Sequence, residues 1–354
     1  MNNIGKISII IPCFNVEDFI VESIYSVINQ SVAGFEILCL DDASTDNTYI
    51  KLMELKLIDD RIKVYRNELN LGLIGTLNRL IELSSGDVLI RMDPDDISSE
   101  NRVSSLIDVM RETGADVVGS AYTIIDAEGA ELNNSALYLP KHSNSIKYTC
   151  AFNSPLPHAT VAYKKNFAKT YGYEHNCFAA EDFDLWVRAV NANSELVYLN
   201  IPESLYFYRM HTASTSNKNR NIQIDSHFQC VLNYKRVNLP KSYLYGSSYV
   251  LLMNKRIGLK EKNLKLLHCV HREIEKCRNE FLESVDCTKE EILEINTYTG
   301  EYSLLLYTRF FSGKSVLSKL FYASISPYFL AVFRGNYSLP GARLFFKRVL
   351  RTLV

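Results

Sequence analysis

The chain has 354 residues, more than one hydrophobic core usually serves, so we expect a main domain and an appended region. Its apolar fraction of 47% and charged fraction of 22% are ordinary for globular proteins and exclude a disordered or fibrous chain. A formal net charge of −1 gives no support to nucleic-acid binding, and we expect no nucleic-acid partner.

Strand and helix patterns alternate through the first third of the chain. Apolar runs predict strands over 6–12, 35–40, 62–65, 87–92 and 116–119. Helical stripes and capping residues predict helices over 17–30, 46–57, 72–83 and 100–111. This alternation predicts an α/β fold with a mostly parallel sheet and helices on both faces. In such sheets ligands bind beyond the carboxyl ends of the strands.

Strand patterns fade beyond about residue 217, and long amphipathic stretches continue to the end of the chain. The polar run 217–221 predicts a linker, so we expect domains at 1–216 and 217–354. The longest uncharged part of the tail, 320–333, has 14 residues and contains Pro327, whereas a bilayer span needs about 20. The apolar run 7–11 is too short for a secretory signal. The eight cysteines form no CxxC pair or zinc spacing, which predicts reduced thiols and a cytosolic protein.

The charges are unevenly distributed along the chain. Residues 1–301 carry 31 basic against 40 acidic side chains, a net −9. After Glu301 there is no acidic residue, and the cations are Arg309, Lys314, Lys319, Arg334, Arg343, Lys347, Arg348 and Arg351. Aromatic and leucine side chains lie between them, a composition typical of helices in a lipid interface. We favour membrane association over the alternative, a helical region that packs on the main domain with a basic outer face.

Acidic residues follow one predicted strand in the segment Asp93-Pro94-Asp95-Asp96. Three carboxylates in four positions repel one another and resist burial unless something neutralises them. Pro94 keeps Asp93 extended, so Asp93 and Asp95 are expected to project to the same side. They would form an oxygen-rich site for Mg²⁺ or Mn²⁺ with room for ligand phosphates. Taken alone, the motif favours an Asp-rich turn that caps the next helix.

A second acidic strand end reverses that preference. Asp42 closes a neighbouring predicted strand and can accept hydrogen bonds from a base or a ribose. With Pro12 and Asn15 after the first strand, the two acidic ends describe a pocket for a metal and a nucleotide. No GxGxxG or GxxxxGK[ST] loop occurs, so the metal must hold the phosphates.

These segments resemble, in their order, successive motifs of the family 2 inverting glycosyltransferases. They are residues 8–15 (Ser-Ile-Ile-Ile-Pro-Cys-Phe-Asn), 40–46 (Leu-Asp-Asp-Ala-Ser-Thr-Asp), 70–73 (Asn-Leu-Gly-Leu) and 91–97 (Arg-Met-Asp-Pro-Asp-Asp-Ile). Members of that family have the GT-A fold, use UDP-sugars and depend on a divalent cation, and the resemblance covers about residues 1–216. It implies that Pro12 and Asp42 contact the uridine. It also implies that Asp93, Asp95 and Asp96 form the DXD site, which binds the ribose and Mn²⁺ or Mg²⁺.

One position departs from the family pattern. Most members carry Arg in an Ala-Arg-Asn segment that here reads Thr76-Leu77-Asn78. Arg91 is a candidate for the missing donor contact, and a salt bridge to a neighbouring carboxylate is an equal alternative.

Glu181 and Asp182 open a predicted helix, where an Asp is most simply an N-cap. The resemblance instead implies that Asp182 is the general base of a single inverting displacement. By the same resemblance, Glu181 and the segment that contains Asn153 and His158 lie on the acceptor side.

The segment 208–212 (Tyr-Arg-Met-His-Thr) resembles the family's Tyr-Arg-x-His segment. It implies that Arg209 approaches the donor diphosphate, which a guanidinium can bind bidentately. It also implies that His211 approaches the metal, although a lone surface histidine is more often inert. No Gln-x-x-Arg-Trp motif occurs, which favours transfer of a single sugar over processive synthesis.

We therefore expect a metal-dependent inverting glycosyltransferase that moves one sugar (Glc, Gal or GlcNAc) from a UDP-sugar to a glycan on a polyprenyl diphosphate. By resemblance it would serve bacterial O-antigen or capsule assembly, on the inner face of the cytoplasmic membrane. One alternative is a sugar nucleotidyltransferase, which would normally have a Gly-rich loop where residues 7–15 contain no Gly. Another is a catalytically silent nucleotide-binding protein associated with the membrane.

Overall fold

The structure is a computed structural model that describes residues 4–132, 139–174, 179–211, 220–243 and 264–310. The chain forms two compact units. The first comprises Met1–Ile146 and Ser154–His227, and the second Lys147–Asn153 and Phe228–Val354. The first unit thus continues past residue 216 into a helix that begins at Arg220.

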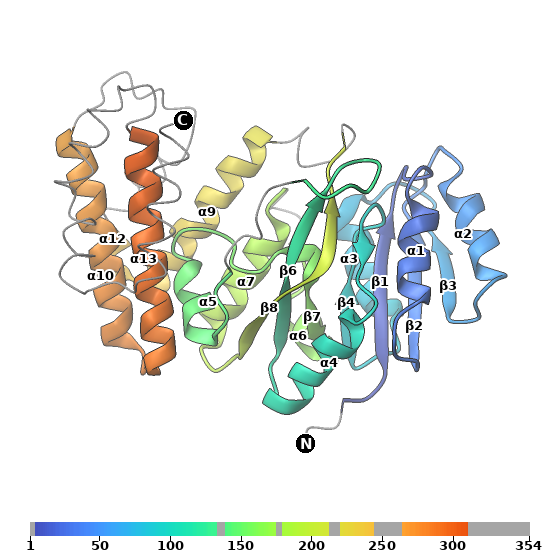
Figure 1. Ribbon diagram of the computed structural model, residues 1–354, viewed down its shortest axis with the longest axis horizontal. Helices are drawn as coiled ribbons and strands as arrows, with labels where there is room; N and C mark the ends of the chain where they lie inside the picture. The colour runs from blue at the N-terminus through green and yellow to red at the C-terminus, as the bar shows by residue number, and fades with distance from the viewer. Residues whose placement is uncertain (1–3, 133–138, 175–178, 212–219, 244–263, 311–354) are drawn as a thin grey trace. The chain divides into compact units, whose positions relative to one another are not determined.

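An eight-stranded sheet forms the centre of the first unit (Figure 1). Its order is β3-β2-β1-β4-β7-β6-β8-β5. The strands are β1 (Ile7–Cys13), β2 (Phe35–Asp41), β3 (Ile62–Arg66), β4 (Val88–Arg91), β5 (Ile97–Ser98), β6 (Val117–Ile125), β7 (Ala162–Lys164) and β8 (Tyr198–Arg209).

The sheet is mostly parallel, as predicted. Strands β3, β2, β1 and β4 pair in parallel, and so do β6 and β8. Only β7 and β5 pair antiparallel with their neighbours in this sheet. All five predicted strands are present. The strands β5 and β7 are two and three residues long, too short for a periodic pattern to reveal them in the sequence.

Helices cover both faces of the sheet. The helices of the first unit are α1 (Ile20–Ile28), α2 (Thr48–Lys56), α3 (Gly72–Leu83), α4 (Arg102–Thr113), α6 (Lys165–Tyr171), α7 (Glu181–Ala192) and the 3₁₀-helix η1 (His158–Thr160). Helix α5 (Ser143–Thr149) is divided between the two units. In Figure 1, α1 and α4 lie in front of the sheet and α3 lies behind it, against β1 and β2.

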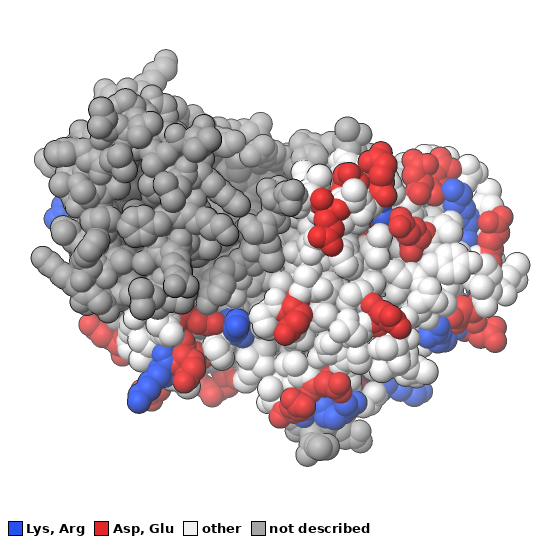
Figure 2. Space-filling view, viewed as in Figure 1, with Lys and Arg blue, Asp and Glu red and all other residues white. Residues whose placement is uncertain are grey.

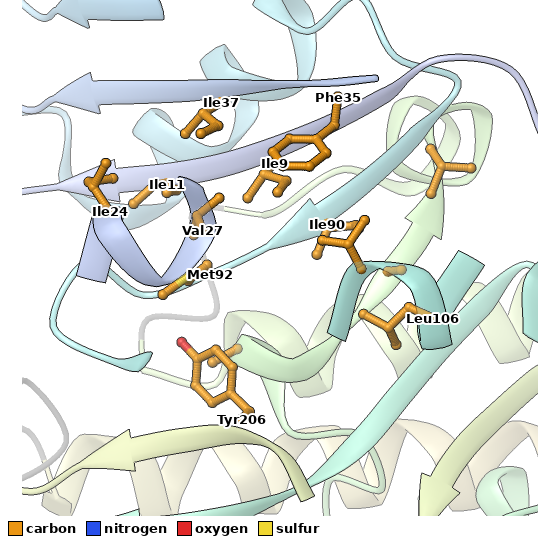
Figure 3. Packing of buried hydrophobic residues seen from close by; sticks show 14 of the residues in the cluster. Ile9, Ile11, Ile24, Val27, Phe35, Ile37, Ile90, Met92, Leu106 and Tyr206 are labelled. Carbon is orange, nitrogen blue, oxygen red and sulfur yellow. The ribbon is translucent and has the colours of Figure 1, made fainter. Parts of the chain in front are cut away.

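The main core lies between the sheet and the helices α1, α2 and α4. Alternate residues of β1, Ile9 and Ile11, point into it beside Ile24 and Val27 of α1 (Figure 3). Ile90 of β4 completes this layer. Burial of both sheet faces explains why the strands read as continuous apolar runs instead of alternating ones.

The first two helices begin later than the sequence pattern indicates. Helix α1 begins at Ile20 and α2 at Thr48. The reason is Asp46, whose carboxylate accepts hydrogen bonds from the N–H groups of Glu17 and Thr48, at 3.1 and 2.9 Å. This carboxylate joins the two loops before the helices, so the residues around it are not helical.

The described part of the second unit is helical, as predicted. Beyond residue 227 it contains the rest of α9 (Arg220–Asn238), with α10 (Pro240–Tyr243), α12 (Leu264–Ser284) and α13 (Lys289–Phe310). Helices α12 and α13 pack on each other. Within the described part of the chain, no helix combines the length and apolarity that a membrane crossing requires. The predicted basic tail from 311 onward lies outside the described residues.

Candidate functional site

The strand ends that carry the predicted site residues meet at one edge of the sheet. Strand β1 lies between β2 and β4, so the strand order reverses at its side. The Asp42 N–H donates to the Cys13 carbonyl at 2.8 Å, and the Met92 N–H donates to the Ile10 carbonyl at 3.1 Å. A reversal of strand order is where open α/β sheets bind ligands. Figure 2, in the same orientation, shows acidic side chains over the upper part of the described surface, where β1 and β2 end.

The loops at this edge contain strained backbone. Among the described residues, the non-glycine residues with positive φ are Asn15 (50°), Ala43 (59°) and Ala179 (65°). They follow β1, follow β2 and precede α7, respectively. Such conformations cost free energy and cluster at functional sites. Asn15 is also tied to the next loop, because its N–H donates to Ser44 Oγ at 3.0 Å and its Oδ1 accepts from the Thr45 N–H at 2.9 Å.

Asp42, the predicted uridine contact, is a buried carboxylate held by the start of α3. Its Oδ1 accepts from Asn67 Nδ2 at 2.6 Å and from the Leu71 N–H at 2.8 Å. Its Oδ2 accepts from the Gly72 N–H at 2.9 Å. These donors fix the direction of the carboxylate. The predicted contact of Asp42 and Pro12 with a uridine stays a prediction.

Each of the three carboxylates of the acidic turn has a different partner. Asp93 pairs with Arg91 Nη1 at 2.5 Å, and Asp95 lies 2.8 Å from His211 Nε2. Asp96 accepts a hydrogen bond from the Arg209 N–H at 2.7 Å. Each carboxylate therefore has its own partner, and these partners offset the mutual repulsion expected from the sequence.

Burial divides these carboxylates into two kinds. The side chains of Asp93 and Asp95 are 27% and 22% exposed, whereas Asp96 is only 1% exposed. Burial, together with the charges of Asp93 and Asp95, raises the pKa of Asp96 well above its ordinary value. Burial also raises the pKa of Asp93, although Arg91 opposes it. The geometry favours Asp95 as a metal ligand and does not favour the same prediction for Asp96.

The two predicted donor-binding arginines are buried, each 2% exposed. Arg91 makes the salt bridge to Asp93 that was the alternative interpretation. The Arg209 guanidinium donates to the Asp95 carbonyl at 2.8 Å, the Ala127 carbonyl at 2.7 Å and Glu22 Oε2 at 2.6 Å. Arg209 therefore holds the acidic turn in place, and this geometry does not favour the predicted bidentate contact with a diphosphate.

Asp95 and His211 are the residues best placed to hold a divalent cation. His211 is oriented by its ring contact with Phe19, with centroids 4.6 Å apart. No group of three or more His, Cys, Asp or Glu side chains within the described ranges is arranged to hold a metal ion. Mg²⁺ and Mn²⁺ in nucleotide sites commonly take one or two protein ligands, with phosphates and water for the rest. A carboxylate beside an imidazole fits that chemistry.

A second acidic corner lies at the start of α7. The helix begins at Glu181 and its N-cap is Ala180, so Asp182 lies inside the first turn and the N-cap interpretation is wrong. Ser154 Oγ donates to Asp182 Oδ2 at 3.4 Å. Burial and the charge of Asp182 raise the pKa of Glu181 to about 7, and burial raises the pKa of Asp182.

The predicted acceptor-side residue His158 lies beside Glu181. Its Nδ1 is 3.9 Å from Glu181 Oε1, and its Nε2 is 2.8 Å from the hydroxyl of Tyr173. Burial and the nearby charge of Arg91 lower the pKa of His158 well below its ordinary value. Asn153 belongs to the second unit, and its predicted acceptor role stays a prediction.

Sequence reasoning missed three residues around the base candidate. Ser154 and Tyr173 carry no signal of their own, because Ser and Tyr are common in loops and cores. His227 interacts electrostatically with Asp182, and its ring lies 5.2 Å from that of Phe183. It was missed because it lies beyond the polar run that was interpreted as a linker.

Comparisons with known proteins find related glycosyltransferases. The family model described as glycosyl transferase family 2 matches residues 8–177. An uncharacterised glycosyltransferase of Haemophilus influenzae is 31% identical over 61% of this chain and 69% of its own length. The Escherichia coli protein named UDP-Glc:alpha-D-GlcNAc-diphosphoundecaprenol beta-1,3-glucosyltransferase WfgD is 27% identical over 73% of this chain and 98% of its own.

A solved structure shares the fold. The crystal structure of S. aureus TarS 1-349 in complex with UDP-GlcNAc matches with a TM-score of 0.54, over 94% of this chain and 93% of that chain. At 15% identity this likeness is one of fold, and it agrees with the GT-A architecture expected from the sequence.

Proposed function

Because the chain belongs to glycosyl transferase family 2, we propose that it moves one sugar from a UDP-sugar to a hydroxyl of an acceptor with inversion at the anomeric carbon. The observation that carries the proposal is that Arg91 interacts with two acidic groups. Its guanidinium pairs with Asp93 in the acidic turn, and its charge acts on Glu181 and Asp182 at the start of α7. Donor and acceptor functions would thus share one corner of the first unit.

Asp182 is the proposed general base. The acceptor hydroxyl would pass its proton to the carboxylate while its oxygen attacks the anomeric carbon. The bond from that carbon to the diphosphate oxygen would break with its electron pair, and UDP would leave. Burial raises the pKa of Asp182, which brings a carboxylate closer to the basicity that proton transfer requires.

Asp95 and His211 would hold Mn²⁺ or Mg²⁺ together with the donor diphosphate. The bound cation would act as a Lewis acid toward the charge on the departing UDP. Asp93 and Asp42 would contact the ribose and the base. Arg91 would keep Asp93 in place through its salt bridge, and Arg209 would keep Asp95 in place through its backbone carbonyl, because both arginines are buried there.

The proposed acceptor is a glycan on a polyprenyl diphosphate. The name of the relative WfgD states such an acceptor, and TarS was crystallised with UDP-GlcNAc. The basic, aromatic tail favours sugar transfer at the cytoplasmic face of a membrane, where such an acceptor is anchored. Bacterial surface polysaccharide assembly is the setting that we propose.

The test is release of UDP in the presence of a GlcNAc-diphosphate-lipid acceptor, Mn²⁺ and each of UDP-Glc, UDP-Gal and UDP-GlcNAc. Asp182→Asn should lower the rate by about 10²–10⁴-fold, the usual contribution of a positioned base, without unfolding the protein. Chelation of the metal should abolish transfer, and Mn²⁺ should restore it. Pyrophosphate release would instead indicate nucleotidyl transfer, and full activity of Asp182→Asn would refute the assignment of the base.

A further inference from the structure

A line of polar side chains leads from the core to the acidic corner of α7. Tyr173 lies at its centre, with its hydroxyl 2.8 Å from His158 Nε2 and 3.3 Å from the hydroxyl of Tyr163. On the far side of the imidazole, Nδ1 is 3.9 Å from Glu181 Oε1. The proposed function assigns no role to either tyrosine.

The backbone of Tyr173 is clamped to α3 from both sides. Asn78 Nδ2 donates to the Tyr173 carbonyl at 2.9 Å, and the Tyr173 N–H donates to Asn78 Oδ1 at 3.0 Å. The tyrosine ring is also buried and lies 5.3 Å from the His158 ring, centroid to centroid. The position of its hydroxyl is therefore set by the fold and does not depend on a flexible side chain.

We propose that Tyr173 is a positioning residue, which holds His158 in the tautomer that carries its proton on Nδ1 and directs that proton at Glu181 beside the base. This inference rests on the proposed function for its effect on catalysis, but the tautomer itself can be measured without any substrate.

The direction of proton donation along this line follows from the residues at its two ends. An ionised Glu181 places negative charge 3.9 Å from His158 Nδ1, which favours a proton on that nitrogen. Nε2 is then an acceptor, and Tyr173 must donate to it, which leaves Tyr163 to donate to Tyr173. Burial raises the pKa of Tyr173 well above its ordinary value, so its O–H remains protonated. The opposite direction of donation requires a protonated Glu181, so the tautomer of His158 should depend on pH.

The charged and titratable groups around Glu181 come from four places. Asp182 follows it on α7 and raises its pKa, as does Asp93 in the acidic turn, whereas Arg91 of β4 lowers it. His158 of η1 faces it directly. A proton on His158 Nδ1, 3.9 Å from Glu181 Oε1, would favour the ionised carboxylate through its charge, so loss of Tyr173's hydroxyl should raise the pKa of Glu181 further.

The first experiment is long-range ¹H–¹⁵N NMR of the full chain with labelled histidine, and His158→Asn assigns the signal. At about pH 8, the wild type should show the Nδ1–H tautomer, and Tyr173→Phe should show a gain of Nε2–H. Tyr25→Phe, on the exposed face of α1, is the matched control and should leave the signal unchanged. Nε2–H in the wild type, or an unchanged signal in Tyr173→Phe, would overturn the proposal.

The second experiment is kinetic. Tyr173→Phe should lower kcat about tenfold, as expected for one hydrogen bond of ordinary strength, and leave KM for the UDP-sugar unchanged. The acidic limb of its pH profile should move to higher pH. On a His158→Asn background the same substitution should have no further effect, because Tyr173 acts through His158. Additive effects would show a general packing role. A wild type without transferase activity would refute the proposed function, and the NMR result would still decide the tautomer.

Discussion

Glu181 and Asp182 are neighbouring carboxyl groups whose burial favours their neutral forms. Arg91 lies close enough for its charge to oppose this effect at both residues, and it also lowers the pKa of His158. Burial and this cation together lower the pKa of the imidazole, and the same cation opposes the rise in the pKa of the base candidate. The sequence indicated each of these residues, but not that Arg91 joins them.

The raised pKa of Glu181 predicts a stability that depends on pH. Its carboxyl stays protonated in the folded protein up to about pH 7, but in the unfolded chain it ionises near its ordinary 4.5. Unfolding releases a proton between these values, so stability falls as pH rises through this range. Glu181→Gln has no carboxyl to ionise at this position, so it should not lose this stability as pH rises. The difference in free energy of unfolding between Glu181→Gln and wild type should therefore shift in favour of the variant by at most about 3 kcal/mol from pH ~4 to pH ~8.

Urea unfolding at several pH values measures this difference. The matched control is Glu54→Gln on the exposed face of α2, which should follow the wild type at every pH. Parallel curves for Glu181→Gln and wild type would contradict the burial of an ionisable carboxyl at this position.

At the scale of elements, two carboxylates at the site depend on the ends of secondary structure. The start of α3 supplies two backbone N–H groups to Asp42, and the end of β8 supplies one to Asp96. Backbone donors cannot be recognised from the sequence, because every residue except proline has one. For that reason the pattern identified Asp42 and Asp96 as acidic strand-end residues but could not separate structural from ligand-binding roles.

Asp42→Asn should destabilise the protein through α3. An amide presents N–H groups where the carboxylate accepts from Leu71 and Gly72, so at least one of these hydrogen bonds is lost. A hydrogen bond to a carboxylate contributes about 1.5–3 kcal/mol, and we expect a loss of about 2 kcal/mol in free energy of unfolding, measured by urea titration. Asp60→Asn, at an exposed position, should cost less than about 0.5 kcal/mol. Equal effects of the two variants would rule out this role of Asp42.

Arg209→Lys should also destabilise the protein, because a lysine cannot reproduce the planar set of donors of a guanidinium. The guanidinium reaches two backbone carbonyls and Glu22 at once, whereas an ammonium is a single charge. We expect a loss of about 2–4 kcal/mol by thermal unfolding. Glu22→Gln removes only the exposed partner, which is 58% accessible, and should cost about 1 kcal/mol or less. A neutral Arg209→Lys would contradict the role of this guanidinium as a clamp on the acidic turn.

At the scale of the whole molecule, the sequence divides into an acidic body and a basic tail. Residues 1–301 carry a net −9, and the eight cations after them are unopposed. All of these cations except Arg309 lie outside the described residues, so the role of the tail is argued from composition alone. Cations near an anionic bilayer contribute about 1 kcal/mol each.

The full chain should therefore bind vesicles that contain anionic lipid and bind zwitterionic vesicles much less. Replacement of Arg343, Lys347, Arg348 and Arg351 by Gln should weaken binding by about 10²–10³-fold. Sedimentation with vesicles at low and high salt measures this effect. Replacement of Lys51, Lys56, Arg61 and Lys63 in the first unit is the charge-matched control. Equal losses from both sets would show that total charge, and not the tail, drives binding.

The sequence by itself determined the α/β class, the parallel strands of the first third and the acidic strand ends that identify the family. These depend on local periodicity and on short motifs, which neighbouring residues carry without help from the rest of the chain. Only the tertiary structure decided which partner each side chain has. Arg209 and Asp96 lie 113 positions apart, and His158 and Glu181 lie on separate elements. Their burial and pairing depend on how the sheet brings distant segments together, and no local pattern records that.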